Sequence, residues 1–225
     1  MSEWLSYSLD DLLMFSPRVY WRLFELHNRS IWPAQAIALM LGIAALALLL
    51  RPRPWSDWLI ASGLGFAWVW VAWSFLWLRY ATINWAIAYV APVFALEALL
   101  LILLKGTADR LLFTIDRSVP AGIGLTLYLY AVVFHPLVPL IAGRSLWSAE
   151  VLAIAPDPTA IATLGLVAMA PRREIAVIGI IPAAWCLTSW ATLHTMGSGL
   201  AVVPLAAICL TGLALAIRLT GSRPT

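Results

Sequence analysis

Long apolar stretches separated by short charged connections constrain the fold of this chain more than any other feature. Six stretches have roughly the 20 residues that an α-helix needs to cross about 30 Å of hydrocarbon. Hydrophobic residues make up 63% of the chain and charged residues 11%, whereas soluble domains hold about one half and one quarter. We therefore expect an all-α, polytopic membrane helix bundle with six full spans, at residues 31–50, 58–78, 86–104, 119–141, 175–194 and 200–219.

A seventh apolar segment, residues 151–170, is interrupted by prolines. Asp157 followed by Pro158 is typical of a helix N-cap and the first helical position. The helix after it would have about 13 residues and a length of about 19 Å, which is too short to cross a bilayer alone. We expect this segment to form a broken or half span.

The Lys and Arg residues between the apolar stretches predict the orientation of the transmembrane domain, residues 31–219, and of its short tail, residues 220–225. With seven crossings, nine of these residues fall on one side and two on the other, leaving out the N-terminal segment. Without a crossing at 151–170 the division is six to five. Because positive residues are enriched on the cytoplasmic side, seven crossings are favoured and the C-terminus is expected in the cytoplasm.

The predicted N-terminal domain, residues 1–30, contains four acidic residues and lacks a continuous apolar core. We expect two short helices there, one starting near Ser8 and one at Ser16 and Pro17. Polar residues recur along one face of the second, which predicts an amphipathic helix in the membrane interface. The alternative is a solvated helix that leads into the first span. The polar face consists of Arg18, Arg22, Glu25 and Arg29.

Several stretches together resemble a known family. Residues 15–18, 20–28 and 32–35 (FSPR, YWRLFELHN and WPAQ) resemble the opening of the bacterial multi-pass membrane family DUF6064, and residues 79–85 and 158–166 resemble its internal signatures. Members are sometimes labelled permeases, so the resemblance implies the bacterial cytoplasmic (inner) membrane. The chain departs from the family at Asp157, where a Cys is usual, and at Glu97, near which a Gln is usual.

Glu97 is the charged residue that lies deepest within an apolar stretch. A carboxyl group there costs a few kcal/mol and normally faces a partner or a watery cavity. One interpretation is a proton, cation or ligand site. The other is a protonated Glu that is hydrogen-bonded between helices, with Thr126 and Thr211 at matching depth.

Four further polar residues are predicted to gather near the outer end of the bundle. His135 precedes Pro136, so the fourth span is expected to kink beside a titratable ring. Asp157 is expected near the same depth, where it and Arg79 would be natural ion partners. With Glu97, the binding or transport candidates are Arg79, Asn84, His135 and Asp157.

Enzyme motifs are absent from the sequence, which holds three separate His and neither a Walker loop nor an HExxH motif. We expect no enzyme activity, cofactor, metal or nucleic-acid partner, and two unpaired cysteines. The favoured function is a small permease or channel-like protein for an ion or small solute. The alternative is an accessory or assembly subunit of a membrane complex. Besides the lipid bilayer, the expected partners are a second copy of the chain or a membrane subunit.

Overall fold

The computed structural model describes residues 15–106, 113, 115–170 and 173–221. Within these residues the fold is all-helical and contains no strand. The helix predicted near Ser8 and most of the predicted C-terminal tail lie outside the described residues. The expected all-α fold is therefore confirmed for the part of the chain that the structure describes.

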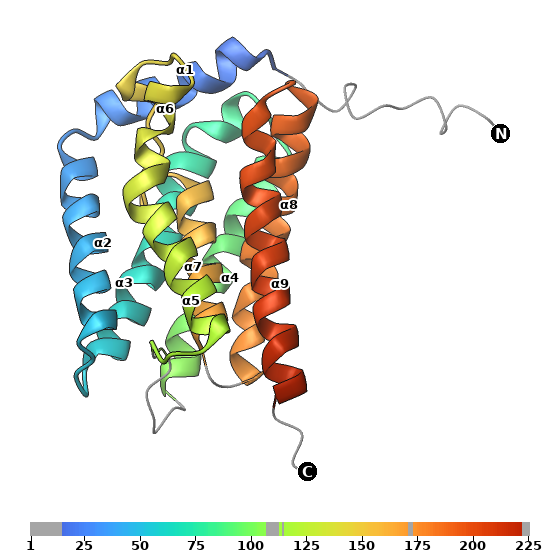
Figure 1. Ribbon diagram of the computed structural model, residues 1–225. Coiled ribbons are helices and arrows are strands. Elements are labelled where there is room, and N and C mark those ends of the chain that lie inside the picture. Colours follow the sequence, from blue (N-terminus) through green and yellow to red (C-terminus); the bar gives the residue numbers. More distant parts are fainter. Residues whose placement is uncertain (1–14, 107–112, 114, 171–172, 222–225) are drawn as a thin grey trace.

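The first described helix, α1 (Pro17–Ser30), lies across one end of the bundle (Figure 1). It begins where the sequence predicts, because the side chain of Ser16 accepts a hydrogen bond from the backbone N–H of Val19. After α1 the chain turns by 90° into α2 (Ala34–Leu50), which runs along the side of the bundle.

The other long helices run up and down the bundle (Figure 1). Two of them, the helices that begin at Ser56 and at Val119, become irregular near the end of the bundle that α1 covers. There π-helical and 3-10 turns replace α-helical turns. The π turns in the fifth helix coincide with the irregularity predicted at His135 and Pro136. The long helices are α3 (Ser56–Trp70, continued by Val71–Trp77), α4 (Ile87–Gly106), α5 (Val119–Leu129, continued to α6, Val138–Ile141), α8 (Ile180–Thr195) and α9 (Val202–Gly221).

Four helical segments are long and apolar enough to cross a membrane, and the count rises to five if the bent pair α1 and α2 forms one span. The prediction of six full spans is therefore wrong. The helix α2 has 17 residues, and the part of α4 whose side chains are described, Ile87–Leu103, has the same length. At 1.5 Å per residue, 17 residues cover about 26 Å, slightly less than the bilayer core. The four candidate spans are Ser56–Thr82, Val119–Ile141, Ile175–Thr195 and Gly199–Thr220.

The helix α7 (Pro156–Met169) lies in the centre of the bundle, and all 14 of its residues are buried. Its N-cap position is Ala155, so Asp157 lies in the first helical turn and is not the N-cap that the sequence predicts. At about 1.5 Å per residue α7 measures about 21 Å, close to the predicted length of the broken segment. The long helices thus surround a short helix that is shielded on every side.

Two glycines allow α7 to approach α5 closely. A side-chain carbon added at Gly124 would lie 2.4 Å from the carbonyl oxygen of Gly165, and one added at Gly165 would lie 2.7 Å from the carbonyl oxygen of Gly124. A hydrogen bond from the indole Nε1 of Trp68 to Thr163 Oγ1, 3.0 Å long, joins α3 to the same central helix. Close backbone contact between small residues is the packing expected where the surrounding solvent is lipid.

Candidate functional site

The chain enters α7 through a buried segment without regular structure, Glu150–Ala155, in which Ala153 has a positive φ of 64°. Thr159 supports this segment, because its Oγ1 accepts a hydrogen bond from the N–H of Ala153 and donates one to the carbonyl oxygen of Ala155. Irregular backbone at membrane depth persists only against protein or water. The segment places Glu150 and Asp157 on the same side of the bundle interior.

Asp157 is held by α8. Its Oδ1 accepts a hydrogen bond of 2.7 Å from the indole Nε1 of Trp185, and its Oδ2 accepts one of 2.5 Å from the hydroxyl of Ser189. Only 3% of the Asp157 surface is exposed. The carboxyl group is therefore an acceptor in a fixed position between two helices.

His135 and Glu150 form a buried pair beside Asp157. The distance from His135 Nε2 to Glu150 Oε2 is 3.8 Å, and each residue is 6% exposed. The ring of Tyr130 packs edge-on against the imidazole at a centroid distance of 5.5 Å. The irregular turns of the fifth helix carry both rings into the interior. We call His135, Glu150 and Asp157 the acid–histidine cluster.

The acid–histidine cluster contains polar atoms without hydrogen-bond partners in the described part of the chain. They are both imidazole nitrogens of His135 and Oε2 of Glu150. The cavity that Asp157 shares with them leaves about 10 Å³ for the centre of a water molecule, near the lower limit for one ordered water. Because buried polar atoms are nearly always hydrogen-bonded, this geometry favours a bound water or an exchangeable proton in the cavity.

Arg144 stacks on one of the residues that line the cavity. Its guanidinium carbon lies 3.4 Å from the ring centroid of Trp21, which itself lines the cavity. Burial lowers the pKa of Arg144 from its ordinary value, whereas the nearby carboxylate of Glu150 acts in the opposite direction. A cation stacked on an aromatic ring thus lies behind one wall of the cavity.

The sequence profile of DUF6064, a family of unknown function, matches residues 17–220. The chain belongs to this family. The matched range runs from the first residue of α1 nearly to the end of α9, so it includes every residue of the acid–histidine cluster. No curated protein and no solved structure matches the chain. The DUF6064 membership confirms the resemblance drawn from the sequence and leaves the activity to be inferred from the site.

The structure brings together two of the four residues predicted to gather at the outer end. His135 and Asp157 line one cavity, whereas Arg79 donates a hydrogen bond of 3.0 Å to the hydroxyl of Ser30. Asn84 accepts a hydrogen bond from the backbone N–H of Ala86 through its own Oδ1. The expected ion pair between Arg79 and Asp157 does not form, because α8 already occupies both carboxyl oxygens.

Glu97 lies apart from this cluster, on α4, and is fully buried. Neither of its carboxyl oxygens has a hydrogen-bond partner within the described residues. The predicted hydroxyl partners bond elsewhere, since Thr126 donates to the carbonyl oxygen of Gly122 and Thr211 to that of Ala207. The proposed hydrogen bonds to these threonines are therefore wrong, while the burial of Glu97 agrees with the sequence.

Sequence reasoning missed Glu150 and Arg144, because both lie at the edge of apolar stretches where charges normally face solvent. Glu97 is one of several buried acidic residues, since Asp57, Glu150 and Asp157 are at most 6% exposed. One signal pointed to Glu150: it immediately precedes the proline-broken segment. A break inside the membrane requires polar support, and the nearest acid is a natural candidate.

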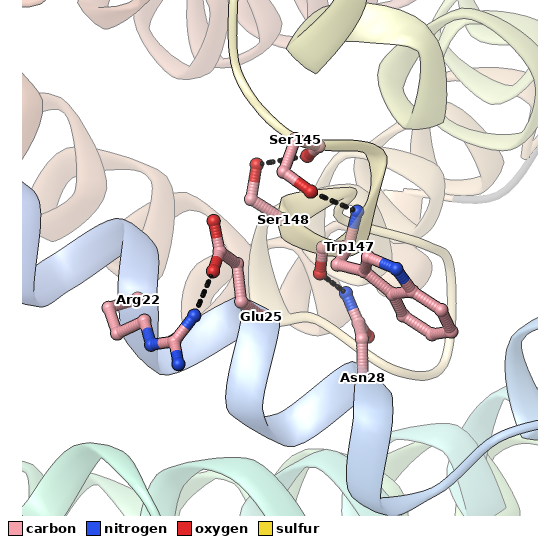
Figure 2. Close-up of polar contacts among 6 residues, drawn as sticks. All are labelled: Arg22, Glu25, Asn28, Ser145, Trp147 and Ser148. Carbon is pink, nitrogen blue, oxygen red and sulfur yellow. Dashed lines mark hydrogen bonds and ion pairs between the residues drawn. The ribbon is translucent and has the colours of Figure 1, made fainter.

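The predicted polar face of α1 points away from the bundle. Three of its residues are exposed and Glu25 is partly buried, with Arg22 NH1 lying 2.6 Å from Glu25 Oε2 (Figure 2). The opposite face packs onto the helix ends, where the Phe24 ring lies 4.6 Å from that of Phe75. The aromatic side chains on the inner face of α1 therefore contact protein and not lipid headgroups. The three exposed residues are Arg18, Arg22 and Arg29.

His27 should make the stability of the α1 contact depend on pH. Burial and the nearby charge of Arg79 lower its pKa from 6.5 to about 4. The unfolded chain therefore binds a proton between these values that the folded chain does not, and stability falls as the pH drops from about 6.5 to 4. One pKa unit corresponds to about 1.4 kcal/mol, so the loss reaches about 3 kcal/mol.

The measurement is the melting temperature of the purified protein between pH 7.5 and 4. We expect His27→Gln to flatten part of this dependence. His194→Gln, which changes an exposed histidine at the end of α8, is the matched control. Identical pH profiles for wild type and His27→Gln would show that His27 is not the titrating group.

Proposed function

We propose that this DUF6064 member is a small permease or channel-like protein of the bacterial cytoplasmic membrane that moves an ion or small solute, and that its acid–histidine cluster holds a proton or cation during transport. The observation that carries the proposal is the burial of two carboxyl groups and an imidazole around one cavity. Ionisable groups inside a membrane protein are costly and usually mark ion or proton pathways. A helix interrupted at membrane depth is a further property of transporter binding sites.

The three members of the cluster differ in what they can do. Asp157 is fixed by two donors from α8, so it is suited to set the local field. Glu150 retains an oxygen, and His135 two nitrogens, without a hydrogen bond. A proton can therefore be shared between these two groups at little geometric cost. We assign proton or cation uptake to the His135–Glu150 pair. To Asp157 we assign the role of orienting this pair.

The cavity has room for a single water, so the structure represents a closed state of the proposed transporter. Opening requires the stacked pair of Arg144 and Trp21 to separate, because Trp21 lines the cavity at the α1 end. Exchange between such closed and open states is the way in which secondary transporters move a substrate past a fixed site.

The topology we propose places α1 in the outer interface and the end of α9 on the cytoplasmic side. Figure 1 supports this placement in one respect, because α9 ends at the opposite end of the bundle from α1. The exposed arginines of α1 are suited to lipid headgroups. The segment that contains α7 is then a short helix within the bundle that is shielded by its neighbours. The function we propose is transport without chemical conversion.

Replacing Glu150 with Gln should abolish most of the transport. The change keeps the size of the side chain but removes the group that takes up the proton or cation. We expect proton or monovalent-cation flux into proteoliposomes, followed with a pH-sensitive dye and with K⁺- and Na⁺-sensitive dyes, to fall about tenfold or more. Asp116→Asn, the same chemical change at an exposed residue outside the predicted spans, should leave the flux unchanged.

Two results would refute the proposal. The first is wild-type protein that moves no more protons, Na⁺ or K⁺ than protein-free vesicles. The second is a folded Glu150→Gln protein that retains the wild-type rate.

A specific observation favours the accessory function as a second candidate. A groove of about 420 Å³ lies between α2 and α3, and its lining is almost entirely apolar, including Leu41, Gly63 and Phe66. An exposed apolar groove of this kind suits a helix of another membrane subunit or of a second copy. Purification in a mild detergent tests this alternative: a stoichiometric partner that is lost in Gly63→Leu would support it.

A further inference from the structure

A second depression lies on the outer side of α1, between this helix and the turn at residues 144–148. We call it the α1 groove. Its volume of about 840 Å³ is within the range of small-molecule sites. Figure 2 shows its two walls, with Arg22 and Glu25 on α1 and the serines of the turn opposite. Its polar lining includes Arg18, Arg22, Glu25, Arg144, Ser145 and Ser148.

The α1 groove has an excess of positive charge. Three arginines line it, and Glu25 is the acidic residue among the lining side chains. That acid is already neutralised, because Arg22 NH1 lies 2.6 Å from its Oε2. Arg18 forms no ion pair within the described part of the chain. The groove therefore attracts an anion and repels a cation.

The walls of the α1 groove are held in place by hydrogen bonds. Asn28 Nδ2 donates to the carbonyl oxygens of Trp147 and Ala149, at 2.7 and 2.8 Å (the first is drawn in Figure 2). Within the turn, the hydroxyl of Ser148 donates to the carbonyl oxygen of Ser145. A site whose walls are fixed before binding loses little entropy when a ligand enters. Because the proton of Ser148 is already used, the guanidinium groups are the main donors available to a ligand.

Arg144 is a hydrogen-bond donor whose guanidinium nitrogens have no acceptor in the described part of the chain. Its Nε and both terminal nitrogens are buried and have no hydrogen-bond acceptor in the described residues. The acid nearest to it in the interior, Glu150, makes its closest ionic contact with His135 instead. A buried guanidinium without acceptors is unfavourable. An anion that accepts two parallel N–H bonds removes this penalty once the guanidinium turns from the Trp21 ring toward the groove.

We propose that the α1 groove binds an oxyanion of the phosphate class, with Arg144 as the bidentate donor and Arg18 supplying additional positive charge. A phosphate fits better than a single carboxylate because it offers enough acceptor oxygens for more than one arginine. The phosphate group has two possible sources, a soluble phosphate compound and the headgroup of an anionic lipid. The α1 groove shares Trp21 with the cavity of the acid–histidine cluster but contains none of the three cluster residues, and the proposal does not depend on transport.

The test is isothermal titration of the purified full-length protein, in a phosphate-free non-ionic detergent, with inorganic phosphate. We expect saturable binding by the wild type and a loss of about tenfold or more in affinity for Arg144→Gln. Arg144→Lys, which keeps the charge but cannot bind in a bidentate manner, should lie between them. Arg53→Gln, the same change at an exposed arginine between α2 and α3, should bind as the wild type does.

Because Arg144 packs on Trp21, its replacement can also weaken the fold. Arg18→Gln avoids this difficulty, since Arg18 is exposed, and we expect it to reduce phosphate affinity by about threefold. The melting temperature of each variant is measured in the same detergent. Equal phosphate affinity of wild type, Arg144→Gln and Arg18→Gln would overturn the proposal, as would an equal loss in Arg53→Gln.

A second titration identifies the source of the phosphate group. The same proteins are titrated with mixed micelles that contain phosphatidylglycerol or, as the neutral counterpart, phosphatidylcholine. Binding of phosphatidylglycerol that requires Arg144, with no binding of free phosphate, assigns the site to a lipid headgroup. Binding of free phosphate assigns it to a soluble ligand, and binding of neither ligand overturns the proposal. These measurements need no ion gradient, so a failure of the flux experiment is distinguishable from a failure here.

Discussion

A Gly124→Ala protein should be among the least stable single variants of this chain. The added carbon would lie 2.4 Å from the carbonyl oxygen of Gly165 and 2.9 Å from the backbone nitrogen of Met169. Both atoms belong to the backbone of α7, which is packed on all sides and cannot move alone. We expect a loss of about 3 kcal/mol, or roughly 10 °C in melting temperature. Thermal unfolding in detergent, followed by tryptophan fluorescence, measures this loss.

Gly122 provides a control on the same helix. A carbon added at Gly122 meets nothing within 4 Å, so Gly122→Ala changes the composition of α5 without changing its contact with α7. We expect its melting temperature to equal or slightly exceed that of the wild type, because Ala favours helix more than Gly does. Similar melting temperatures for Gly124→Ala and Gly122→Ala would mean that α5 and α7 are not in backbone contact.

The central position of α7 illustrates what the sequence could and could not predict. Proline placement and length predicted a short helix within residues 151–170, and the structure contains one of 14 residues. Nothing in the periodicity predicted that all of its faces would be buried, because the helix is apolar all round and offers no preferred face. The close contact of Gly124 with Gly165 depends on the pairing of two distant helices, which a single sequence does not specify.

The number of spans was overestimated for a different reason. Hydropathy detects apolar stretches, and each of the six predicted stretches coincides with helix in the structure. Hydropathy does not detect where a helix bends or ends. Residues 31–33 belong to the bend between α1 and α2, so α2 is three residues shorter than the first predicted stretch. The length of the first predicted span fell for this reason.

The candidate site was predicted in part, because burial of a polar group depends on tertiary structure. His135 and Asp157 were predicted as site residues because prolines adjoin them in the sequence, and the structure places both in one cavity. Glu150 belongs to the same cavity but follows a connection rich in polar residues, where an acid normally faces solvent. Arg79 was expected to pair with Asp157. It instead donates a hydrogen bond to the hydroxyl of Ser30, and its charge lies near His27. The depth of a residue along its helix could be predicted from the sequence, whereas the side of the helix from which its side chain projects could not.

Asp157→Ala should be the most damaging change within the acid–histidine cluster. Asp157 accepts the only hydrogen bonds that the indole of Trp185 and the hydroxyl of Ser189 make to another side chain in the described residues. Alanine leaves both donors buried without an acceptor and leaves a cavity between α7 and α8. We expect a loss on the order of 4 kcal/mol, measured as the change in thermal unfolding in detergent.

Asp157→Asn separates this structural role from the proposed transport. The amide keeps one oxygen acceptor, and its NH₂ group can donate to the Ser189 oxygen once that hydroxyl rotates, so the hydrogen bonds between α7 and α8 are largely preserved. We expect this variant to lose only about 1 kcal/mol of stability. Its flux should nevertheless fall well below that of the wild type, because a neutral amide cannot orient the His135–Glu150 pair by its field. An Asp157→Ala protein as stable as the wild type would show that these hydrogen bonds do not hold α7 to α8. A stable Asp157→Asn protein with unchanged flux would confine Asp157 to a structural role and leave Glu150 as the functional acid of the cluster.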